Sequence, residues 1–426
     1  MLHPIKKLNI AVIGGGVAGI VSAYLLGRNH EVTIFEKNDY LGGHTHTSII
    51  SDGPDKGTPV DTGFIVCNDK TYTNFQHFIK QLGIKTRPSD MSFGVYKTQG
   101  PFFYSSDVPN GLFAQRRNLF RPSFYKMIFD ILRFQKLTNR TLKVGLSDQA
   151  TLGDFLKTHH FGRRFIDDHI IPLGAAIWST SLEKMLEYPA YSFLGFIRNH
   201  GLADLKATVK WQTIVGGSHS YVKAFETQFK GKIILNVKDI KVKRISGQIL
   251  VSVGEKEQLF DEVIIATHAD QALNLINDPT LLEKELLSAW EYSSNETVLH
   301  TDKSVMPPVR RAWASWNYLN ATSIGATSKD RSSLTYFMNR LMGLKTHNDW
   351  FVTLNATGLI MPDKILHSFI YEHPVFTNKS LTSQKRLQEL NGQNHTYFCG
   401  SYFGYGFHED AVKSALHVAK HFGEAL

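Results

Sequence analysis

The first 36 residues alternate between apolar runs and short polar or glycine-rich breaks. Residues 8–13 form a nearly continuous apolar run of strand length, which is typical of a parallel strand buried on both faces. Apolar and small residues then recur at helical spacing over 17–26, and a second strand-like run over 31–35 ends at Glu36. The pattern predicts a strand, a turn, a helix and a second strand in close succession.

Glycines fill the turn between the first strand and the helix, in the order Gly14-x-Gly16-x-x-Gly19. In such a unit the first glycine makes the tight turn, the second lets the backbone approach a pyrophosphate, and the third allows close packing of helix on strand. The helix N-terminus offers free N–H groups to the phosphates. Glu36 is placed to accept hydrogen bonds from a ribose diol. The sequence therefore predicts a dinucleotide site.

The rest of the chain predicts a second structural unit, because 426 residues exceed one ordinary core. Residues 76–209 are mostly helical in pattern, and Ser147–Leu156 contains a capped helix start. Antiparallel strands are predicted at 311–318, 333–338, 350–355 and 367–371. Aromatic residues crowd these strands, either as a sheet core or as one wall of an apolar substrate pocket.

Composition narrows the class of protein. Hydrophobic residues at 42% and charged residues at 20% are ordinary for a globular chain and argue against disorder. The only two cysteines, Cys67 and Cys399, lie too far apart in sequence for a metal-ligand pair and supply no disulfide framework. No apolar run approaches the roughly 18 residues of a membrane span. These features favour a cytoplasmic protein.

The net charge of +9 is concentrated in one segment. Between Arg116 and Lys143 eight basic residues face one acid, Asp130, which favours an anionic membrane surface over nucleic acid as the partner. An apolar face after Pro122 is formed by Phe124, Ile128, Ile131 and Leu132. We expect an interfacial helix within 112–143, lying on the inner face of the membrane. The alternative is a helix that packs on the protein and exposes a basic face.

Two histidines follow the nucleotide unit, at positions 44 and 46. No further ligand at a suitable spacing completes a metal site, so we expect no metal. Strand-like alternation predicts that His44 and His46 point in opposite directions, one of them toward the cofactor. His46 is a candidate general base. The chain has no G-x-S-x-G motif, which argues against hydrolase chemistry.

Beyond Glu36 the sequence resembles the flavin amine oxidase superfamily, first in Leu41-Gly42-Gly43-His44-Thr45. Further landmarks are 60–64 (Val-Asp-Thr-Gly-Phe), 211–218 with its two glycines, 234–237, 262–267, 397–400 and 406–409. The resemblance implies non-covalent FAD and an α/β fold: a Rossmann-like, glutathione-reductase-like FAD-binding domain interleaved with a mixed substrate domain. The residues expected to contact FAD are Gly14, Gly15, Gly16, Val17, Ala18, Gly19, Glu36, Lys37, Gly42, Gly43, His44, Gly63, Phe64, Ile65, Val237, Ala266, Thr267, Gly400, Ser401, Phe407 and His408.

This resemblance also implies a domain division. The FAD-binding domain is expected at 1–75, 210–275 and 390–426, and the substrate domain at 76–209 and 276–389. A narrower resemblance, to bacterial amine-oxidase-like proteins related to a domain fused to cyclopropane fatty acyl synthases, lies in 41–47, 88–93, 311–318 and 404–410. It implies a fatty acyl chain as substrate and a lipid methyltransferase as partner.

Four positions depart from the amine oxidase pattern. His44 replaces an arginine to the flavin phosphates, which weakens charge neutralisation or makes it pH-dependent. Ser401 replaces an acid at the ribityl chain, and Cys399 does not occupy the position of a flavin-linking cysteine. Phe407 replaces a tyrosine of the substrate cage, which puts amine oxidation in doubt; with Tyr405 and His46 it is a candidate active-site residue.

We therefore expect an FAD-dependent oxidoreductase that accepts a hydride at flavin N5 from an apolar substrate. The backbone N–H near His408, at a helix N-terminus, is expected to stabilise negative charge on the reduced ring. The alternatives are a flavin oxidase acting on a small amine and a non-catalytic flavoprotein that assists a lipid-modifying methyltransferase. The sequence does not identify the molecule that reoxidises the flavin.

Overall fold

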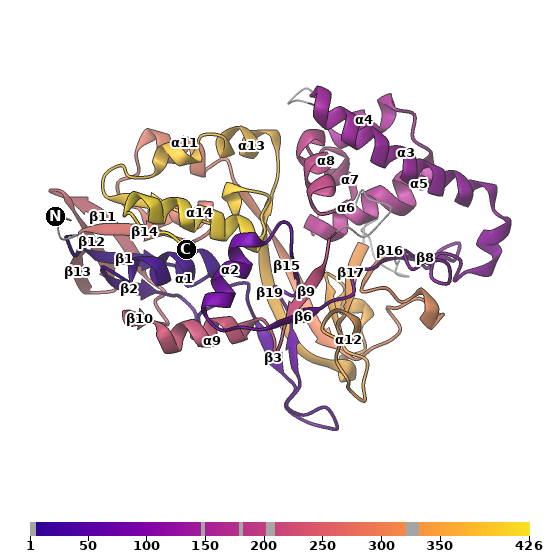
Figure 1. The fold of residues 1–426 in the computed structure, drawn as a ribbon, viewed down its shortest axis with the longest axis horizontal. Coiled ribbons are helices and arrows are strands. Elements are labelled where there is room, and N and C mark those ends of the chain that lie inside the picture. Colours follow the sequence, from indigo (N-terminus) through magenta and orange to yellow (C-terminus); the bar gives the residue numbers. More distant parts are fainter. Residues whose placement is uncertain (1–5, 146–149, 179–181, 202–208, 321–331) are drawn as a thin grey trace.

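A computed structural model describes residues 6–145, 150–178, 182–201, 209–320 and 332–426. The chain builds two large sheets with helices around them (Figure 1). The parallel sheet and its helices α1 and α14 lie at the left of the view, and helices α3–α8 lie at the upper right. The second large sheet extends from β15 and β19 in the middle of the view to β16 and β8 at the right, below these helices. No described helix is long and apolar enough to cross a membrane.

The parallel sheet has five strands, in the order β10-β2-β1-β14-β20. Their bounds are β10 Lys232–Ile234, β2 Glu31–Phe35, β1 Asn9–Ile13, β14 Glu262–Ile265 and β20 Thr396–Phe398. Every pair in this sheet is parallel. The predicted strand, turn, helix and strand are confirmed, and helix α1 (Val17–Leu26) connects β1 to β2. Strands from the two ends of the chain thus share one sheet, in which β14 lies between β1 and β20.

Strand β1 is buried on both faces, as its apolar run predicts. Ile10 and Val12 pack into one hydrophobic cluster, together with α1 and α14 (His408–His421). Ala11 and Ile13 pack into another, against the antiparallel meander β11 (Ile240–Ile245), β12 (Gln248–Val253) and β13 (Lys256–Phe260). Burial on both sides fixes β1 in the centre of the sheet, so the glycine turn at its carboxyl end is held rigidly.

The second large sheet has seven strands, in the order β19-β15-β18-β17-β16-β7-β8. Their bounds are β19 Ile365–Val375, β15 Glu291–His300, β18 Phe351–Leu354, β17 Ser332–Phe337, β16 Trp316–Asn320, β7 Phe93–Lys97 and β8 Phe102–Ser105. All of its pairs are antiparallel except β16 with β7. The four strands predicted from alternation are present.

The first predicted strand, 311–318, begins later than expected. Residues 310–312 form a single 3-10 turn, and β16 starts only at Trp316. The reason is a local turn in which the Asn317 side chain accepts a hydrogen bond from the Ala314 N–H at 2.9 Å and donates one to the Ala314 carbonyl at 2.6 Å. Ser315 next to it donates to Asp90 at 2.8 Å, so segments 88–93 and 311–318 lie together.

Helices dominate 116–200, as predicted, but strands β6 (Thr86–Pro88), β7 and β8 precede them and were not predicted. The helices are α3 Pro122–Val144, α4 Leu152–Thr158, α5 Arg163–Phe165, α6 Ile171–Trp178, α7 Leu182–Leu186 and α8 Ala190–Asn199, with 3-10 turn η1 at Arg116–Phe120. Helix α4 is capped by Thr151 and Asp154, so the predicted capped start is present, while Ser147 lies outside the described residues. The domain boundaries stay a prediction.

Smaller elements join the two halves of the chain. They are β3 Thr47–Ile49, β4 Pro59–Asp61, β5 Cys67–Asn68, α2 Thr73–Gln81, β9 Trp211–Ile214, α9 His219–Gln228, α10 Ala269–Leu275, α11 Leu281–Leu287, α12 Met338–Leu341 and α13 Asn378–Gln384. β3 pairs with β4, and β9 pairs with both β5 and β6. These pairings bring residues 44–68 and 211–219 to the boundary between the large sheets.

The expected amphipathic face of α3 points inward. Phe124 is fully buried in a hydrophobic cluster, and Ile128 and Ile131 pack against the same cluster while Leu132 is half-buried. Phe124, Ile128 and Ile131 therefore hold the helix on the protein, and the four residues do not form a membrane-facing stripe. The prediction of that face was wrong, because periodicity identifies an apolar face without identifying what covers it.

Candidate flavin site and active site

The glycine turn after β1 has the geometry of a phosphate cradle. Gly14 has φ +104°, in the left-handed region, and a Cβ there would lie 2.7 Å from the Ala266 carbonyl oxygen. A Cβ at Gly19 would collide with the Gly14 carbonyl oxygen, so helix α1 packs directly on the turn. A Cβ at Gly16 would meet nothing within 4 Å. The turn is thus tight below and open above, where a pyrophosphate would approach.

Glu36 ends β2 with its carboxylate under this turn. One oxygen accepts a hydrogen bond from the Gly15 N–H at 2.6 Å and the other accepts one from the Asn38 N–H at 2.9 Å. A carboxylate has about four acceptor positions, so lone pairs remain for a diol. The Glu36 carbonyl accepts from the Val237 N–H at 2.9 Å, which places both residues at the same strand end.

The other residues expected at FAD surround this turn. Gly42 donates its N–H to the Gly15 carbonyl at 2.8 Å, and Ala266 donates to the Ile13 carbonyl at 2.8 Å. A Cβ at Gly400 would lie 3.3 Å from the Thr267 carbonyl oxygen, so the β14 and β20 ends meet. The structure therefore brings together segments 14–19, 36–43, 237, 266–267 and 400. Their contacts with FAD stay a prediction.

A stacked pair of rings links the 60–64 segment to the C-terminal helix. Phe64 and His408 are buried and stack at 3.7 Å with an interplanar angle of 11°. The His408 Nε2 is hydrogen-bonded to the Thr45 hydroxyl at 2.8 Å, and that hydroxyl meets the Tyr221 hydroxyl at 2.6 Å. Burial lowers the pKa of His408 to about 3, so its ring is neutral at physiological pH. His408 is the first residue of α14, whose N-terminal N–H groups have no acceptor within the helix.

These features fit FAD. The open space above Gly16 admits a pyrophosphate, the N-terminus of α1 offers N–H groups to it, and Glu36 has free acceptor positions for the adenosine ribose. The N-terminus of α14 offers a second positive dipole end for the pyrimidine side of a flavin. Lys37 is exposed beside Glu36. The residues that would hold the cofactor are those of the glycine turn, Glu36 and the start of α14.

His44 and His46 do not point in opposite directions. The ring of His44 lies 4.7 Å from that of Tyr371, and the His46 Nδ1 lies 3.0 Å from the Tyr371 hydroxyl. Residues 44–46 form no strand, because Gly42 and Gly43 have positive φ and Thr45 closes a turn by donating to the Gly42 carbonyl. The predicted alternation was wrong, and both side chains face β19.

His44 offers no positive charge to a phosphate. Its Nε2 lies 3.3 Å from the Nε2 of His373, whose Nδ1 accepts a hydrogen bond from the Asn295 amide at 2.9 Å. Burial, and then the neighbouring imidazole of His373, hold the pKa of His44 well below its usual value. Burial lowers the pKa of His373 to about 4. We call His44, His46, Tyr371 and His373 the histidine cluster.

His46 lies apart from the other two active-site candidates. It lines an open groove of about 530 Å³ between β3 and β19, with Ser48, His367 and Phe369. Its Nδ1 also meets the Thr62 hydroxyl at 3.1 Å. No contact among the described residues joins His46 to residues 405–407.

Tyr405 and Phe407 share one aromatic patch. Phe407 stacks on Phe196 of α8 at 4.8 Å, and Tyr405 meets the same ring at 5.8 Å. His200 stacks on Phe196 at 3.8 Å and lies 5.8 Å from Phe407. The His200 Nδ1 donates to the Phe196 carbonyl at 3.1 Å, which leaves Nε2 as its acceptor nitrogen. Burial lowers the pKa of His200 to about 4.

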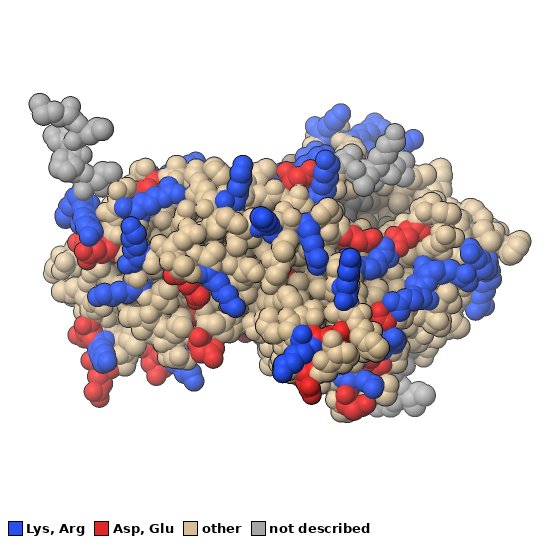
Figure 2. Space-filling model, turned by 60° about the horizontal axis from the view of Figure 1, so that its bottom comes forward, with Lys and Arg blue, Asp and Glu red and all other residues tan. Residues whose placement is uncertain are grey.

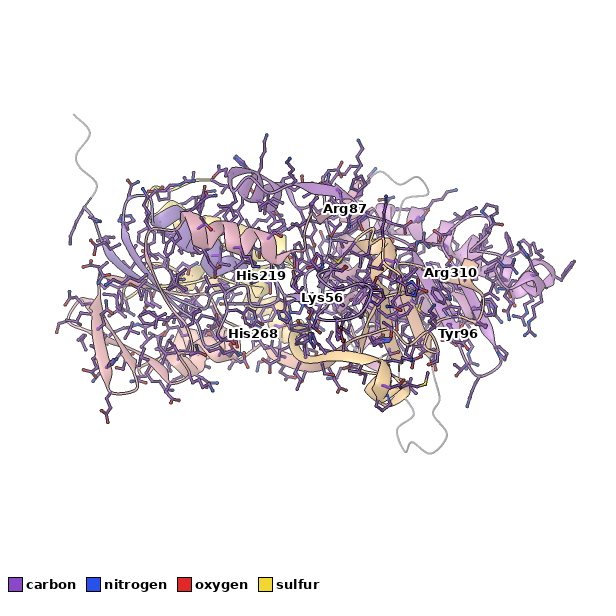
Figure 3. The ribbon with its side chains drawn as sticks, turned by 90° about the horizontal axis from the view of Figure 1, so that it is seen from below. Lys56, Arg87, Tyr96, His219, His268 and Arg310 are labelled. Carbon is purple, nitrogen blue, oxygen red and sulfur yellow. The ribbon has the colours of Figure 1, made fainter. Side chains whose placement is uncertain are left out.

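The sequence analysis missed several residues of this region. Neither His200 nor Tyr371 lies in a motif. His268 occupies the N-cap position of α10, and its ring stacks 4.2 Å from that of Tyr292. Figure 3 labels His219 and His268, which come from different elements and both lie near the middle of the molecule. The only signal in the sequence was the abundance of histidine, 19 residues, which does not say where they meet.

Asp61 belongs to the 60–64 landmark, but the sequence did not predict that it forms a buried hub of hydrogen bonds. It accepts hydrogen bonds from the Thr47 hydroxyl at 2.6 Å, the Ser218 N–H at 2.8 Å and the Ser218 hydroxyl at 2.9 Å. Burial raises the pKa of Asp61 to about 7. The hub fastens the β3–β4 hairpin to the turn before α9, and so positions residues 44–47 and 217–219 relative to each other.

Cys399 is fully buried at the end of β20, 3.7 Å from the Ser22 hydroxyl of α1. Burial raises the pKa of this thiol to about 12, so it is protonated at physiological pH and is a poor nucleophile. Ser401 begins a 3-10 turn, and its carbonyl accepts from the Gly406 N–H at 3.2 Å. Within the described residues no group of three or more His, Cys, Asp or Glu could hold a metal ion.

Comparison with known proteins decides the family. The sequence model of flavin containing amine oxidoreductases matches residues 17–334, which is most of the chain. This protein belongs to the flavin containing amine oxidoreductase family. The family description implies a flavin cofactor and oxidoreductase chemistry. The narrower bacterial subgroup stays a prediction.

Curated relatives in the family are distant. An L-amino-acid oxidase from Siganus canaliculatus is 24% identical over 330 residues, which are 70% of this chain and 57% of the relative. A tryptophan 2-monooxygenase from Allorhizobium ampelinum is 49% identical over 51 residues, which are 12% of this chain and 7% of that enzyme. The chain thus spans little more than half the length of the L-amino-acid oxidase that it matches.

Solved structures confirm the predicted fold class over nearly the whole chain. A CLA-producing fatty acid isomerase from P. acnes superimposes with a TM-score of 0.69 at 15% identity, covering 98% of this chain and 99% of that one. Cyclohexylamine oxidase from Brevibacterium oxydans gives 0.70 at 12% identity, covering 98% and 100%. At these identities the likeness concerns the fold alone.

Proposed function

We propose that this protein uses FAD to dehydrogenate an apolar substrate, a fatty acyl chain. The observation that carries the proposal is the aromatic patch of Phe407, Phe196, His200 and Tyr405. In it the ring of Phe407 stacks on Phe196 and brings no hydroxyl. Such a surface offers apolar contact to a hydrocarbon chain.

FAD supplies hydride acceptance at flavin N5, while the acyl chain loses a proton from the adjacent carbon and gains a C=C bond. The aromatic patch would hold the chain and exclude water. The N-terminal N–H groups of α14 at His408 would stabilise negative charge on the reduced ring. His200 is neutral, and its acceptor nitrogen is directed away from the Phe196 carbonyl, so it is the candidate to accept the proton.

The fatty acid isomerase from P. acnes supports an acyl substrate, since a family fold of this size accommodates one there. The L-amino-acid oxidase supports a second candidate, oxidation of a small amine or amino acid. The two candidates differ in what the site must bind. An amine oxidase must receive a deprotonated amine, whereas an acyl dehydrogenase needs only apolar contact near the flavin.

Anaerobic reduction separates the candidates. The FAD-loaded protein is mixed without oxygen with free fatty acids, phospholipids, primary amines and L-amino acids in turn, and the visible band of oxidised flavin is followed. We expect bleaching by an acyl compound alone. Bleaching by amines or amino acids alone would replace the proposal with the second candidate. A flavin that none of them reduces would favour a non-catalytic partner of a lipid-modifying methyltransferase.

A matched pair of variants tests the aromatic patch. Phe407→Leu keeps the patch apolar and is expected to keep most of the acyl reduction rate. His200→Gln keeps an acceptor group but removes the imidazole, and is expected to slow acyl reduction without loss of FAD. If both variants reduce at the parent rate with every substrate, the patch is not the substrate site.

A further inference from the structure

A patch of exposed aromatic side chains lies far from the flavin site, on η1 and the start of α3. Phe120 is 86% exposed and Phe129 is 62% exposed, and they are the only phenylalanines among the exposed large hydrophobic residues of the described chain. Leu119 and Tyr125 are exposed beside them. Exposed phenylalanines are costly in water, so a cluster of them indicates a surface that something covers.

These residues form one continuous surface. Tyr125 donates its hydroxyl hydrogen to the Leu119 carbonyl at 3.0 Å, which joins η1 to α3 across Pro122. Phe129 lies one helical turn after Tyr125 and so shares its face. We call Leu119, Phe120, Tyr125 and Phe129 the apolar tip. The face predicted from the sequence is a different one, and its residues Phe124, Ile128 and Ile131 pack inward.

Basic residues surround the apolar tip. Arg116, Arg117 and Lys126 are exposed, and none of them makes an ion pair with a described residue. Figure 2 shows Lys and Arg side chains gathered at the right-hand end of the molecule, the end that carries β8 and the first part of α3 in Figure 1. An apolar tip with a basic rim matches an anionic bilayer in both chemistry and charge.

The guanidinium groups of the rim are also crowded. Burial, and then the charges of Arg117 and Arg164, lower the pKa of Arg121. Arg121 is held by neutral groups, the Asn118 side chain at 3.1 Å and the Gln115 side chain at 3.5 Å, and not by a carboxylate. Anionic headgroups would relieve this repulsion, whereas a neutral surface would leave it.

We propose that the apolar tip and its rim, Arg116, Arg117, Arg121 and Lys126, dock the protein on an anionic phospholipid bilayer. The aromatic side chains enter the region between headgroups and acyl chains, and the basic side chains contact the headgroup phosphates. The docking is peripheral and reversible. It is independent of the proposed function, because it requires neither flavin reduction nor an acyl substrate in the active site.

The test is co-sedimentation of the FAD-loaded full chain with vesicles. One set is pure phosphatidylcholine and the other contains phosphatidylglycerol, each at low and high salt. We expect binding only to the anionic vesicles, weakened by salt because the rim is exposed. Arg116→Gln with Arg117→Gln should weaken binding about 30-fold, at about 5-fold for each charge. Phe120→Ser with Phe129→Ser should weaken it about 100-fold.

A control variant removes charges and an exposed apolar side chain elsewhere on the surface. Lys243→Gln and Lys256→Gln on the β11–β13 meander, with Leu281→Ser on α11, remove two charges and one exposed apolar side chain remote from α3. It should bind as the parent does, and all variants should keep stoichiometric FAD. Equal binding to neutral and anionic vesicles, tip variants that bind as the parent does, or binding to duplex DNA in place of vesicles would each overturn the proposal.

Discussion

The glycine turn and the histidine cluster are neighbouring regions that are built in different ways. Residues 14–36 form the turn within one strand, helix and strand, so the backbone geometry is set by nearby residues. The histidine cluster joins residues 44–46 to residues 371–373 across more than 300 residues of chain. The first region binds through backbone N–H groups, and the second presents neutral rings.

Because of this difference, we expect the two regions to respond to different changes. Backbone groups cannot be altered without altering the fold, so the turn should tolerate few substitutions. The rings of the histidine cluster are held by burial and by one another, and their protonation opposes that burial. The turn should therefore respond to changes in shape, and the cluster to changes in pH.

The largest effect is expected at Gly16. A valine there would place its side chain in the open space above the turn, where the pyrophosphate must approach, while meeting no protein atom. Crowding of this kind costs up to about 3 kcal/mol, which is about 100-fold in Kd for FAD. Gly16→Val should therefore fold but be purified without FAD, and Gly16→Ala should retain part of it. Flavin absorbance per chain and circular dichroism check both points. Stoichiometric FAD in the valine variant would refute the assignment of the turn.

The next effect concerns pH and the histidine cluster. Because the folded-state pKa of His373 is about 4 and the unfolded value is 6.5, its contribution to stability is present above pH 6.5 and is lost as pH falls toward 4. Protonation of this residue lowers the free energy of unfolding by up to about 3 kcal/mol. His373→Asn keeps an acceptor for Asn295 and does not titrate, so its stability should fall less steeply with acid. Urea unfolding at a series of pH values measures this free energy. If it falls equally steeply with acid in the parent and in the variant, His373 does not cause the pH dependence.

A substitution of Phe407 tests whether this residue contacts the substrate or the cofactor. Phe407→Ala would remove the ring that stacks on Phe196 and should lower kcat/KM for the reducing substrate about 10-fold, a loss of about 1.4 kcal/mol of contact. The FAD content should stay the same, because the backbone at the start of α14 is unchanged. Loss of FAD with an unchanged rate per bound flavin would move Phe407 to the cofactor side.

Cys399 should have the smallest effect. Its thiol is buried beside Ser22, and its raised pKa keeps it protonated, so we expect FAD to be released intact when the protein is denatured by heat or acid. Cys399→Ala should bind FAD as the parent does. Flavin that remains with the denatured parent chain but not with the variant would show a covalent bond at this residue.

The sequence predicted the parts of this molecule that depend on neighbours in the chain. The β1 strand, helix α1, the glycine turn and Glu36 were placed correctly because each is determined within a few residues. Contacts between residues that are distant in the sequence could not be predicted from the local pattern. Asn317 delays β16 by a turn, Gly42 and Gly43 redirect His44 and His46, and Tyr371 reaches them only through the pairing of β15 with β19.

Helix α3 shows the same limit for a surface. Its helical spacing and Pro122 start were predicted, but the packing partners that cover Phe124 come from distant helices. The exposed aromatic residues, Phe120 and Phe129, were distinguishable from the buried ones only when those helices were in place. Periodicity gave the faces of the helix, and tertiary packing decided which face is free.

The central claim is that the flavin dehydrogenates an acyl chain at the aromatic patch. Its most direct measurement is the mass of the acyl chain after a single anaerobic turnover with stoichiometric FAD-loaded protein. The proposal predicts a loss of two hydrogen atoms from one acyl chain for each flavin that is bleached. An unchanged acyl mass together with a flavin that only amines or amino acids bleach would contradict it.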